Sequence, residues 1–361
     1  MTTARMFPDF GRALRDPRSL WTLAAIVVSG AVGLALVALS SNSTWDAVSA
    51  FWDGTCGSAY AVGSSINRAV AFALVGLGYI LANRANLTNV GGEGQIAVGG
   101  MLATAAALNQ GIGGLPAGLA VLLPLLSGTA AGSVWGALAG WFKVRRGTNE
   151  VISTLLLTFV GLLLVYGAVQ SEALLRQPMT SSATLPESLE IPDSTKLPLL
   201  FAASSSPLHL GAPLTLAALG LGWIVLARSR FGFHLKAVGH NPLAARRAGI
   251  RDGRVVIVAL AVAGALGGLA GALMIQGQQY SLTSGFSSGF GFDGLVVGLL
   301  ARGSPLGVLL GALCFGFLRS GGIAMEIAAG VPAAVVLIIE GLLVVTIAAA
   351  SQLASRQEGA S

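Results

Sequence analysis

The chain has 361 residues, of which 54% are hydrophobic and only 10% are charged. Soluble domains carry about 25% charged residues, so this composition, with a mean hydropathy of +0.78, excludes a soluble globular protein. The formal net charge is +6, but the basic residues separate apolar runs and do not gather on one soluble domain, which argues against nucleic-acid binding. We therefore expect an all-α integral membrane protein.

A transmembrane helix requires about 20 mostly apolar residues. About ten segments, with eight as the lower bound, meet or approach this requirement: 20–39, 64–82, 94–108, 115–141, 150–169, 211–228, 254–275, 291–301, 305–319 and 331–350. The third and eighth are short, which is tolerated for re-entrant segments shielded by protein. The first follows four arginines and exceeds a signal-peptide core, so we expect a retained anchor, with a cleaved signal as the alternative.

Basic residues indicate which side of the membrane each loop faces, because cytoplasmic loops are enriched in lysine and arginine. Ten spans and a cytoplasmic N-terminus put all but four of the 21 lysines and arginines inside, the exceptions being Arg68, Arg176, Lys196 and Arg319. We expect a cytoplasmic segment 1–19, one transmembrane domain 20–350 and a cytoplasmic tail 351–361. In this arrangement the polar loops 40–63 and 170–210 face outward, and the basic loop 229–254 is cytoplasmic.

The third segment begins with polar residues after a run of glycines, Asn-Val-Gly-Gly-Glu-Gly-Gln at 89–95. Glu93 lies where a carboxylate is stabilised by the unpaired N–H groups and dipole of a helix N-terminus, so one interpretation is a helix cap. The alternative is that Glu93 and Gln95 line a path, since glycines allow irregular backbone beside a cavity in the membrane.

The fifth segment also has a polar start, where Thr148 or Asn149 is a candidate cap and Glu150 lies in the first turn. Ser153 and Thr154, one turn deeper, are predicted either to bond neighbouring helices or to face a pore. Asp293 opens the short eighth segment from the opposite side of the membrane to Glu93 in the third. This opposition predicts two inverted five-helix halves, a common transporter plan.

Small residues and one acidic residue mark other spans. Glycine and alanine recur at helical spacing in 128–136 and 264–272, which favours close helix packing in lipid, with a sliding surface as the alternative. Glu340 lies near the middle of the last span, where a charge is costly unless it is paired or neutral. Arg302 and Arg319 are candidate partners, and a role in substrate passage or proton transfer is the alternative.

The cytoplasmic loop contains local signals for a short helix. Asn241 suits the N-cap, Pro242 suits the first helical position, and Gly249 suits the left-handed residue after the end. Arginines 246, 247, 251 and 254 surround this end and keep it out of the hydrocarbon. The segment is either a rigid helix that another protein can push or an ordinary basic loop.

Several chemistries are excluded by missing motifs. No P-loop is present and none of the three lysines follows a glycine, so the chain does not hydrolyse ATP itself. The histidines lack metalloprotease spacing, and the two cysteines have neither disulfide-framework nor metal-ligand spacing. We expect no enzyme active site, no bound cofactor and no metal.

Six motifs in order resemble a known family: residues 89–95, Asn-Glu-Val-Ile-Ser-Thr at 149–154, Ala-Val-Gly-His-Asn-Pro with Ala-Gly-Ile in 237–250, Gly-Gly-Leu-Ala-Gly-Ala at 267–272, Gly-Phe-Asp-Gly at 291–294 and Ser-Pro-Leu-Gly at 304–307. Together they are similar to the membrane permease subunits of bacterial ABC importers of the simple-sugar and branched-chain amino-acid class. The nearest likeness is to the nucleoside branch, whose binding lipoproteins belong to the basic-membrane-protein family.

This resemblance implies a type II importer permease in the bacterial cytoplasmic membrane, moving substrate by alternating access. It implies a separate ATPase subunit that hydrolyses ATP with Mg²⁺, an extracytoplasmic substrate-binding lipoprotein, surrounding membrane lipid, and a second permease, with a heterodimer favoured over a homodimer. The loop 229–254 then becomes a coupling loop, whose ATPase-contacting residues are Gly239, His240, Asn241, Pro242, Ala244, Ala245, Arg246, Arg247 and Gly249. The expected path residues are Glu93, Gln95, Asn149, Glu150, Ser153 and Asp293.

The expected substrate is a nucleoside, and simple sugars such as ribose or galactose are the alternative. An ion-coupled secondary transporter is a third hypothesis, and a scaffold without transport activity is a weaker one. The ion-coupled hypothesis predicts charge pairs deep in several spans and gives no reason for a capped cytoplasmic helix.

Overall fold

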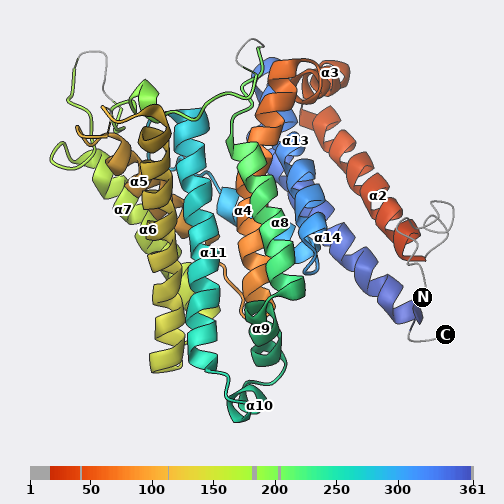
Figure 1. Cartoon of the computed structure of the whole chain (residues 1–361). Coiled ribbons are helices and arrows are strands. Elements are labelled where there is room, and N and C mark those ends of the chain that lie inside the picture. The colour runs from red at the N-terminus through yellow and green to blue at the C-terminus, as the bar shows by residue number, and fades with distance from the viewer. Residues whose placement is uncertain (1–16, 41–42, 113, 181–184, 202–204, 359–361) are drawn as a thin grey trace. The chain divides into compact units, whose positions relative to one another are not determined.

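The computed structural model describes residues 17–40, 43–112, 114–180, 185–201 and 205–358, and its regular structure is helical. The helices are α2 (Pro17–Ser40), α3 (Thr44–Thr55), α4 (Ala59–Asn83), α5 (Gly92–Ala107), α6 (Ala117–Arg146), α7 (Glu150–Gln170), α8 (Gly211–Arg228), α9 (Arg230–His240), α10 (Pro242–Arg247), α11 (Asp252–Met274), α12 (Phe290–Leu300), α13 (Pro305–Ala329) and α14 (Ala333–Glu358), with a 3₁₀ turn η1 (Asp193–Thr195) and a π-helical turn η2 (Ile275–Gln279) (Figure 1).

Every apolar segment expected from the sequence contains a helix, but not every helix is long enough to cross a membrane. Within the described ranges, six helices have the length and composition of a span: α4, α6, α7, α8, α13, and α11 continued by η2. The pair α2 and α3, bent by 119°, raises the number to seven if it is one broken span. The helices α5 and α12 have 16 and 11 residues and are too short to cross on their own. The protein is therefore a multi-pass membrane protein, and the count of ten spans stays a prediction.

Two helices were not expected from the sequence. The first, α3, lies in the segment expected to be an outward polar loop, and Ser43 caps it by accepting a hydrogen bond from the Asp46 amide at 3.3 Å. The second, α9, precedes the expected cytoplasmic helix and buries Leu235 and Val238, three residues apart on one face. Both are shorter than a span, so hydropathy alone does not reveal them.

The chain divides into two compact units, Val62–Phe317 and the pair of segments Met1–Ala61 and Leu318–Ser361. In the second unit, Gly33 of α2 packs beneath Ile339 of α14, and Ser29 and Thr346 share a 2.6 Å hydrogen bond between their hydroxyl oxygens. Glu340 is buried in this unit, with 4% of its surface exposed.

The larger unit depends on direct backbone contact between α6 and α11. A Cβ atom on Gly264 of α11 would lie 2.1 Å from the carbonyl oxygen of Gly132, and one on Gly136 of α6 would lie 2.1 Å from that of Leu260. No side chain fits at either position. The expectation that small residues serve close helix packing is confirmed for this pair of helices.

Candidate functional site

The short helix α10 is defined by its own caps. The Asn241 side-chain oxygen accepts a hydrogen bond from the Ala244 amide at 3.0 Å, Pro242 occupies the first helical position, and Gly249 follows with a φ of +82°. The capped helix expected from the sequence is confirmed in its geometry. In Figure 1, α10 projects beyond the ends of α6 and α11, and the chain then continues into α11.

Most of α10 is exposed, and one buried residue and one ion pair connect it to the rest of the unit. Among the expected coupling residues, Ala245 is buried, Gly239 is partly buried, and the exposed ones are His240, Asn241, Pro242, Ala244, Arg246, Arg247 and Gly249. Leu243 adds an apolar side chain with 58% of its surface exposed. Arg246 forms an ion pair with Asp252 of α11 at 2.6 Å, which ties the end of α10 to the start of the next span.

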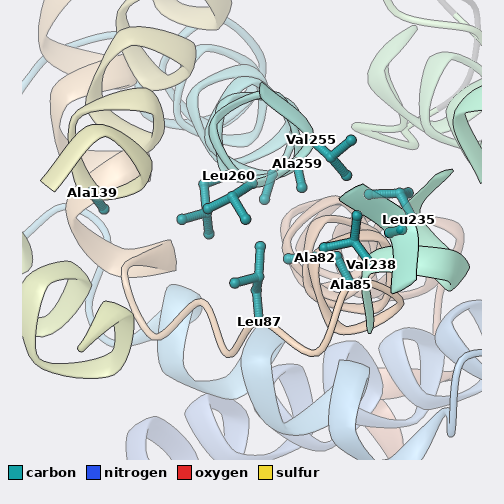
Figure 2. Close-up of a cluster of buried hydrophobic side chains, with 12 residues drawn as sticks. Ala82, Ala85, Leu87, Ala139, Leu235, Val238, Val255, Ala259 and Leu260 are labelled. Atoms are coloured by element: carbon teal, nitrogen blue, oxygen red, sulfur yellow. The ribbon is translucent and has the colours of Figure 1, made fainter. Parts of the chain in front are cut away.

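The buried face of this segment belongs to a hydrophobic cluster shared with three spanning helices. Ala245 joins Leu235 and Val238 of α9 in that cluster, together with residues of α4, α6 and α11 and the chain after α4. Figure 2 shows Leu235 and Val238 beside Ala82 and Ala85, with Val255, Ala259 and Leu260 of α11 and with Leu87 across from them. Because Ala245 is buried in this cluster, α10 is packed against the ends of the spanning helices and is not joined to them by flexible chain alone.

Gly239 packs α9 closely against the backbone just after α4. A Cβ atom at this position would lie 2.4 Å from the carbonyl oxygen of Arg84 and 3.1 Å from the Cα of Ala85. Both neighbours are backbone atoms and cannot rotate away. Only glycine at this position therefore permits α9 to pack so closely against the chain at the end of α4.

Glu93 connects two short helices that are far apart in the sequence. One carboxylate oxygen accepts hydrogen bonds from the Ser287 hydroxyl at 2.5 Å and the Gly289 amide at 3.0 Å, and the other accepts from the Gly291 amide at 2.6 Å. The side chain is buried, with 3% of its surface exposed. Glu93 thus caps the N-terminus of α12 while it lies in the first turn of α5, and the dipoles of both helices favour its negative charge.

Gln95 is also buried and forms a reciprocal amide pair with Asn89. The Asn89 side-chain nitrogen donates to the Gln95 oxygen at 3.1 Å, and the Gln95 nitrogen donates to the Asn89 oxygen at 3.2 Å. The same Asn89 oxygen accepts from the Gly91 amide at 3.0 Å, and the Thr154 hydroxyl oxygen accepts from the Val90 amide at 3.2 Å. These bonds hold the chain where it enters α5.

Of the remaining expected path residues, three lie at the start of α7 and one lies in the helix that Glu93 caps. Asn149 caps α7 by accepting from the Val151 amide at 2.8 Å, and Ser153 donates to the Asn149 carbonyl at 3.0 Å. Glu150 forms an ion pair with Lys143 at the end of α6. Asp293 lies partly exposed in the first turn of α12.

The structure thus brings Glu93 together with the start of α12, where Asp293 lies, and leaves Asn149, Glu150 and Ser153 at the start of α7. Thr154 joins the two places through its bond to Val90. Sequence reasoning missed Ser287, because nothing in a local pattern links it to a residue 194 positions away.

The loop between α7 and α8 is tied to the end of α11. The Leu197 amide donates to the Gln276 carbonyl at 2.9 Å, and the Gln276 side chain donates to the Thr195 carbonyl at 2.6 Å. Hydrogen bonds from Lys196 to Asp193 and to a second loop carboxylate raise the pKa of its ammonium group. Burial lowers the pKa of the nearby His209 to about 4, so this imidazole is neutral at physiological pH.

Comparison with known proteins gives one family. Residues 61–348 match the family described as the permease component of branched-chain amino acid transport systems. No solved structure matches the chain.

Among curated relatives, the glucose ABC transporter permease protein TsgB13 of Haloferax volcanii is 35% identical over 90% of this chain and 84% of its own length. The guanosine ABC transporter permease protein NupP of Bacillus subtilis is 32% identical over 90% of this chain and 92% of its own length. A second guanosine ABC transporter permease protein of that organism, NupQ, is 25% identical over 72% of this chain and 80% of its own length.

Proposed function

The chain belongs to the family of branched-chain amino acid transport permease components, and on this basis we propose that it imports nucleosides by alternating access driven through α9 and α10. As a permease component of an ABC transporter, it is a transport subunit without its own ATPase site. Its family implies an ATPase partner and a substrate-binding protein. We assign the contact with the ATPase, and the transmission of its movement, to the segment Arg230–Arg247.

One observation carries this proposal: the exposed α10 is joined to the ends of α4 and α11 through buried contacts. Ala245 anchors α10 in the shared cluster, and Gly239 holds α9 against the backbone of α4. We propose that the ATPase pair binds the exposed face of α10 on the cytoplasmic side. Its closure then moves α4 and α11 as packed bodies, which an unanchored loop would not do.

We expect Gly239→Val to abolish coupled transport. The valine side chain would meet the Arg84 carbonyl and lift α9 from α4, so uptake should fall at least about tenfold, since overpacking of this kind costs about 1–3 kcal/mol. The measurement is substrate uptake by the assembled complex, with membrane level and ATPase activity determined in parallel.

Gly220→Val on α8 is the matched control, because nothing lies within 4 Å of a Cβ atom there. Its uptake should equal that of the wild type. Normal uptake by Gly239→Val, at a normal membrane level, would contradict the coupling role.

The substrate proposal is a purine or pyrimidine nucleoside. It is supported by the similarity to the guanosine permease along 92% of that protein's length. The glucose permease of Haloferax volcanii, similar over nearly as much of its length, favours a simple sugar such as glucose, ribose or galactose as the second candidate.

Competition distinguishes the two substrate classes. In a host without other nucleoside importers, cells that express the complete transporter should accumulate labelled guanosine. Excess adenosine should suppress this uptake and excess ribose or glucose should leave it unchanged. Guanosine accumulation no higher than in cells without the permease, combined with sugar uptake, would replace the nucleoside by a sugar.

We propose that the permease pairs with a different permease and not with itself. Two guanosine permease proteins in one organism support this pairing, since both are similar to this chain. We also propose ten helical segments in two inverted halves and cytoplasmic termini. The meeting of the α5 and α12 N-termini, both of them short helices, supports the inverted plan.

We propose that all six polar residues contribute to the translocation path, in different roles. Glu93 and Gln95 position the junction through their hydrogen bonds, and the partly exposed Asp293 is the member of that junction best placed to meet substrate. Asn149, Glu150 and Ser153 lie at the start of α7, at the end of the route. An ion-coupled transporter is not favoured, because it assigns no role to the anchored α10.

A further inference from the structure

A cavity of about 290 Å³ lies beside the coupling segment and is lined by residues that do not belong to the hydrophobic cluster. Three parts of the chain form it: the end of α4, the second half of α9, and the turn between α12 and α13. Its lining residues are Ile80, Asn83, Arg84, Asn86, Lys236, Gly239, His240, Arg302 and Gly303. Neither the coupling role nor the transport path assigns a function to this space.

The lining is strongly basic. Arg84, Lys236 and Arg302 carry fixed positive charges, His240 is a further donor, and no aspartate or glutamate is among the lining residues. In the part of the chain that the structure describes, none of these four side chains has an ion pair or a side-chain hydrogen bond. By contrast, the cations of Lys143 and Arg246 nearby on the same side are each paired with a carboxylate. The cavity therefore has a concentrated positive charge that the protein itself does not neutralise.

Two lining residues hold an unfavourable backbone conformation. Asn86 has a φ of +56° and Arg302 a φ of +48°, both in the left-handed region. Asparagine tolerates this region, but a long side chain such as arginine is uncommon there, and the conformation costs about 1 kcal/mol. Gly303, with a φ of +79°, follows at once and completes the tight turn that brings Arg302 to the cavity.

The chemistry of the cavity fits a phosphate group. Arginine and lysine are the side chains that bind phosphate, and the amides of Asn83 and Asn86 add further hydrogen-bonding groups. Pockets for whole small molecules measure about 300–1,000 Å³, so a volume at the lower limit suits a headgroup and not a complete nucleotide.

The position of the cavity favours a lipid as the source of that phosphate. It lies where the spanning helix α4 ends at Asn83 and the spanning helix α13 begins at Pro305, which is the level at which helices leave the hydrocarbon. On the first turns of α13, Leu306 and Leu310 expose 64% and 61% of their surfaces, so apolar surface is available to acyl chains beside the turn. Basic pockets between transmembrane helices are known to bind anionic lipid headgroups.

We propose that this cavity binds the phosphate of an anionic phospholipid headgroup. The bound phosphate bridges Arg84 at the end of α4, Lys236 on α9 and Arg302 before α13. It reduces the repulsion among these cations and strengthens the packing of α9 against α4. The lipid would thus act as a structural component of the coupling region.

The experiment uses the full-length chain in neutral detergent and native mass spectrometry, with dioleoylphosphatidylglycerol and dioleoylphosphatidylcholine as probes. We expect one phosphatidylglycerol to be retained at a concentration at which phosphatidylcholine is not. The variant Arg84→Gln/Arg302→Gly removes two cations and places glycine at the left-handed φ. It should weaken phosphatidylglycerol binding at least about tenfold, because each basic residue contributes substantially to the attraction of an anionic lipid. If this variant fails to fold, Arg84→Gln/Lys236→Gln replaces it.

The control variant Arg145→Gln/Arg254→Gln removes the same charge from exposed residues that do not line the cavity, and it should bind phosphatidylglycerol like the wild type. Equal losses in both variants, or equal retention of the two lipids by the wild type, would overturn the proposal. A separate sample receives inorganic phosphate alone. Thermal stabilisation by phosphate in the wild type but not in the cavity variant, without a preference for phosphatidylglycerol, would make free phosphate the ligand. If the cavity variant binds phosphatidylglycerol like the wild type but loses the ATPase subunit when the complex is purified, the cavity is a contact site for that protein and not for lipid.

Discussion

Replacing Glu93 with alanine is expected to lower the free energy of unfolding by about 3–5 kcal/mol and to abolish transport. The Ser287 hydroxyl and the Gly289 and Gly291 amides all donate to this one buried carboxylate. Alanine leaves the three donors without their acceptor, and Ser287 and Gly291 are buried, where a stranded donor costs about 1–3 kcal/mol before relaxation. The measurement is reversible unfolding of the purified chain in mixed micelles, with uptake measured in cells.

Two further variants test whether the loss of the buried carboxylate acceptor causes the loss of stability. Glu93→Gln keeps one acceptor oxygen but turns an N–H₂ group toward a donor, so its stability should fall between those of the wild type and Glu93→Ala. Glu172→Ala removes an exposed carboxylate from the loop after α7 and should change stability by less than about 0.5 kcal/mol. If Glu93→Ala were as stable as Glu172→Ala, the proposed connection between α5 and α12 would be wrong.

Gly264→Leu is expected to have the second largest effect, a loss of about 3 kcal/mol or more together with the loss of uptake. Its Cβ atom would lie 2.1 Å from the Gly132 carbonyl oxygen and 3.0 Å from the Cα of Gly136, so α6 and α11 must separate to admit any side chain. Separation also disturbs the cluster that anchors α10, since α11 contributes to both contacts. Unfolding in mixed micelles and the membrane level of the variant measure the two consequences.

The control is Gly220→Leu on α8, where a Cβ atom meets nothing within 4 Å. Both substitutions add the same apolar side chain to a spanning helix, so insertion into the membrane should be equally favourable. Gly264→Ala should show a smaller loss than leucine but a clear one. Wild-type stability for Gly264→Leu would mean that α6 and α11 do not rely on this contact.

Local features of this protein were predictable from the sequence because their causes lie within a few residues. Asn241, Pro242 and Gly249 define a helix between them, and the structure has that helix. Long apolar segments predicted helices because lipid offers no hydrogen-bond partners to the backbone, which leaves helix as the available form. The missing P-loop and the ordered motifs identified the class of transporter, and the family match confirmed it.

Features that depend on distant parts of the chain were not predictable in the same way. From the sequence, Glu93 was either a cap or a path residue. The structure makes it a cap of α12, where it accepts a hydrogen bond from Gly291, 198 positions further along the chain. The sequence marked Gly239 as a coupling residue, but only the structure shows that it packs against the Arg84 carbonyl. Hydropathy likewise predicted α5 and α12 as apolar segments and did not establish whether they cross the membrane.

The sequence by itself determined that this is a helical membrane permease with a capped, basic helix between spans. Composition, hydropathy and cap residues act over one helix at a time, so they can be read without knowing the neighbours. Only the tertiary structure decided what that helix is fixed to, which carboxylate closes α12, and which cations surround a shared cavity. Those outcomes follow from packing, in which the position of each backbone depends on residues that the chain brings together from far apart.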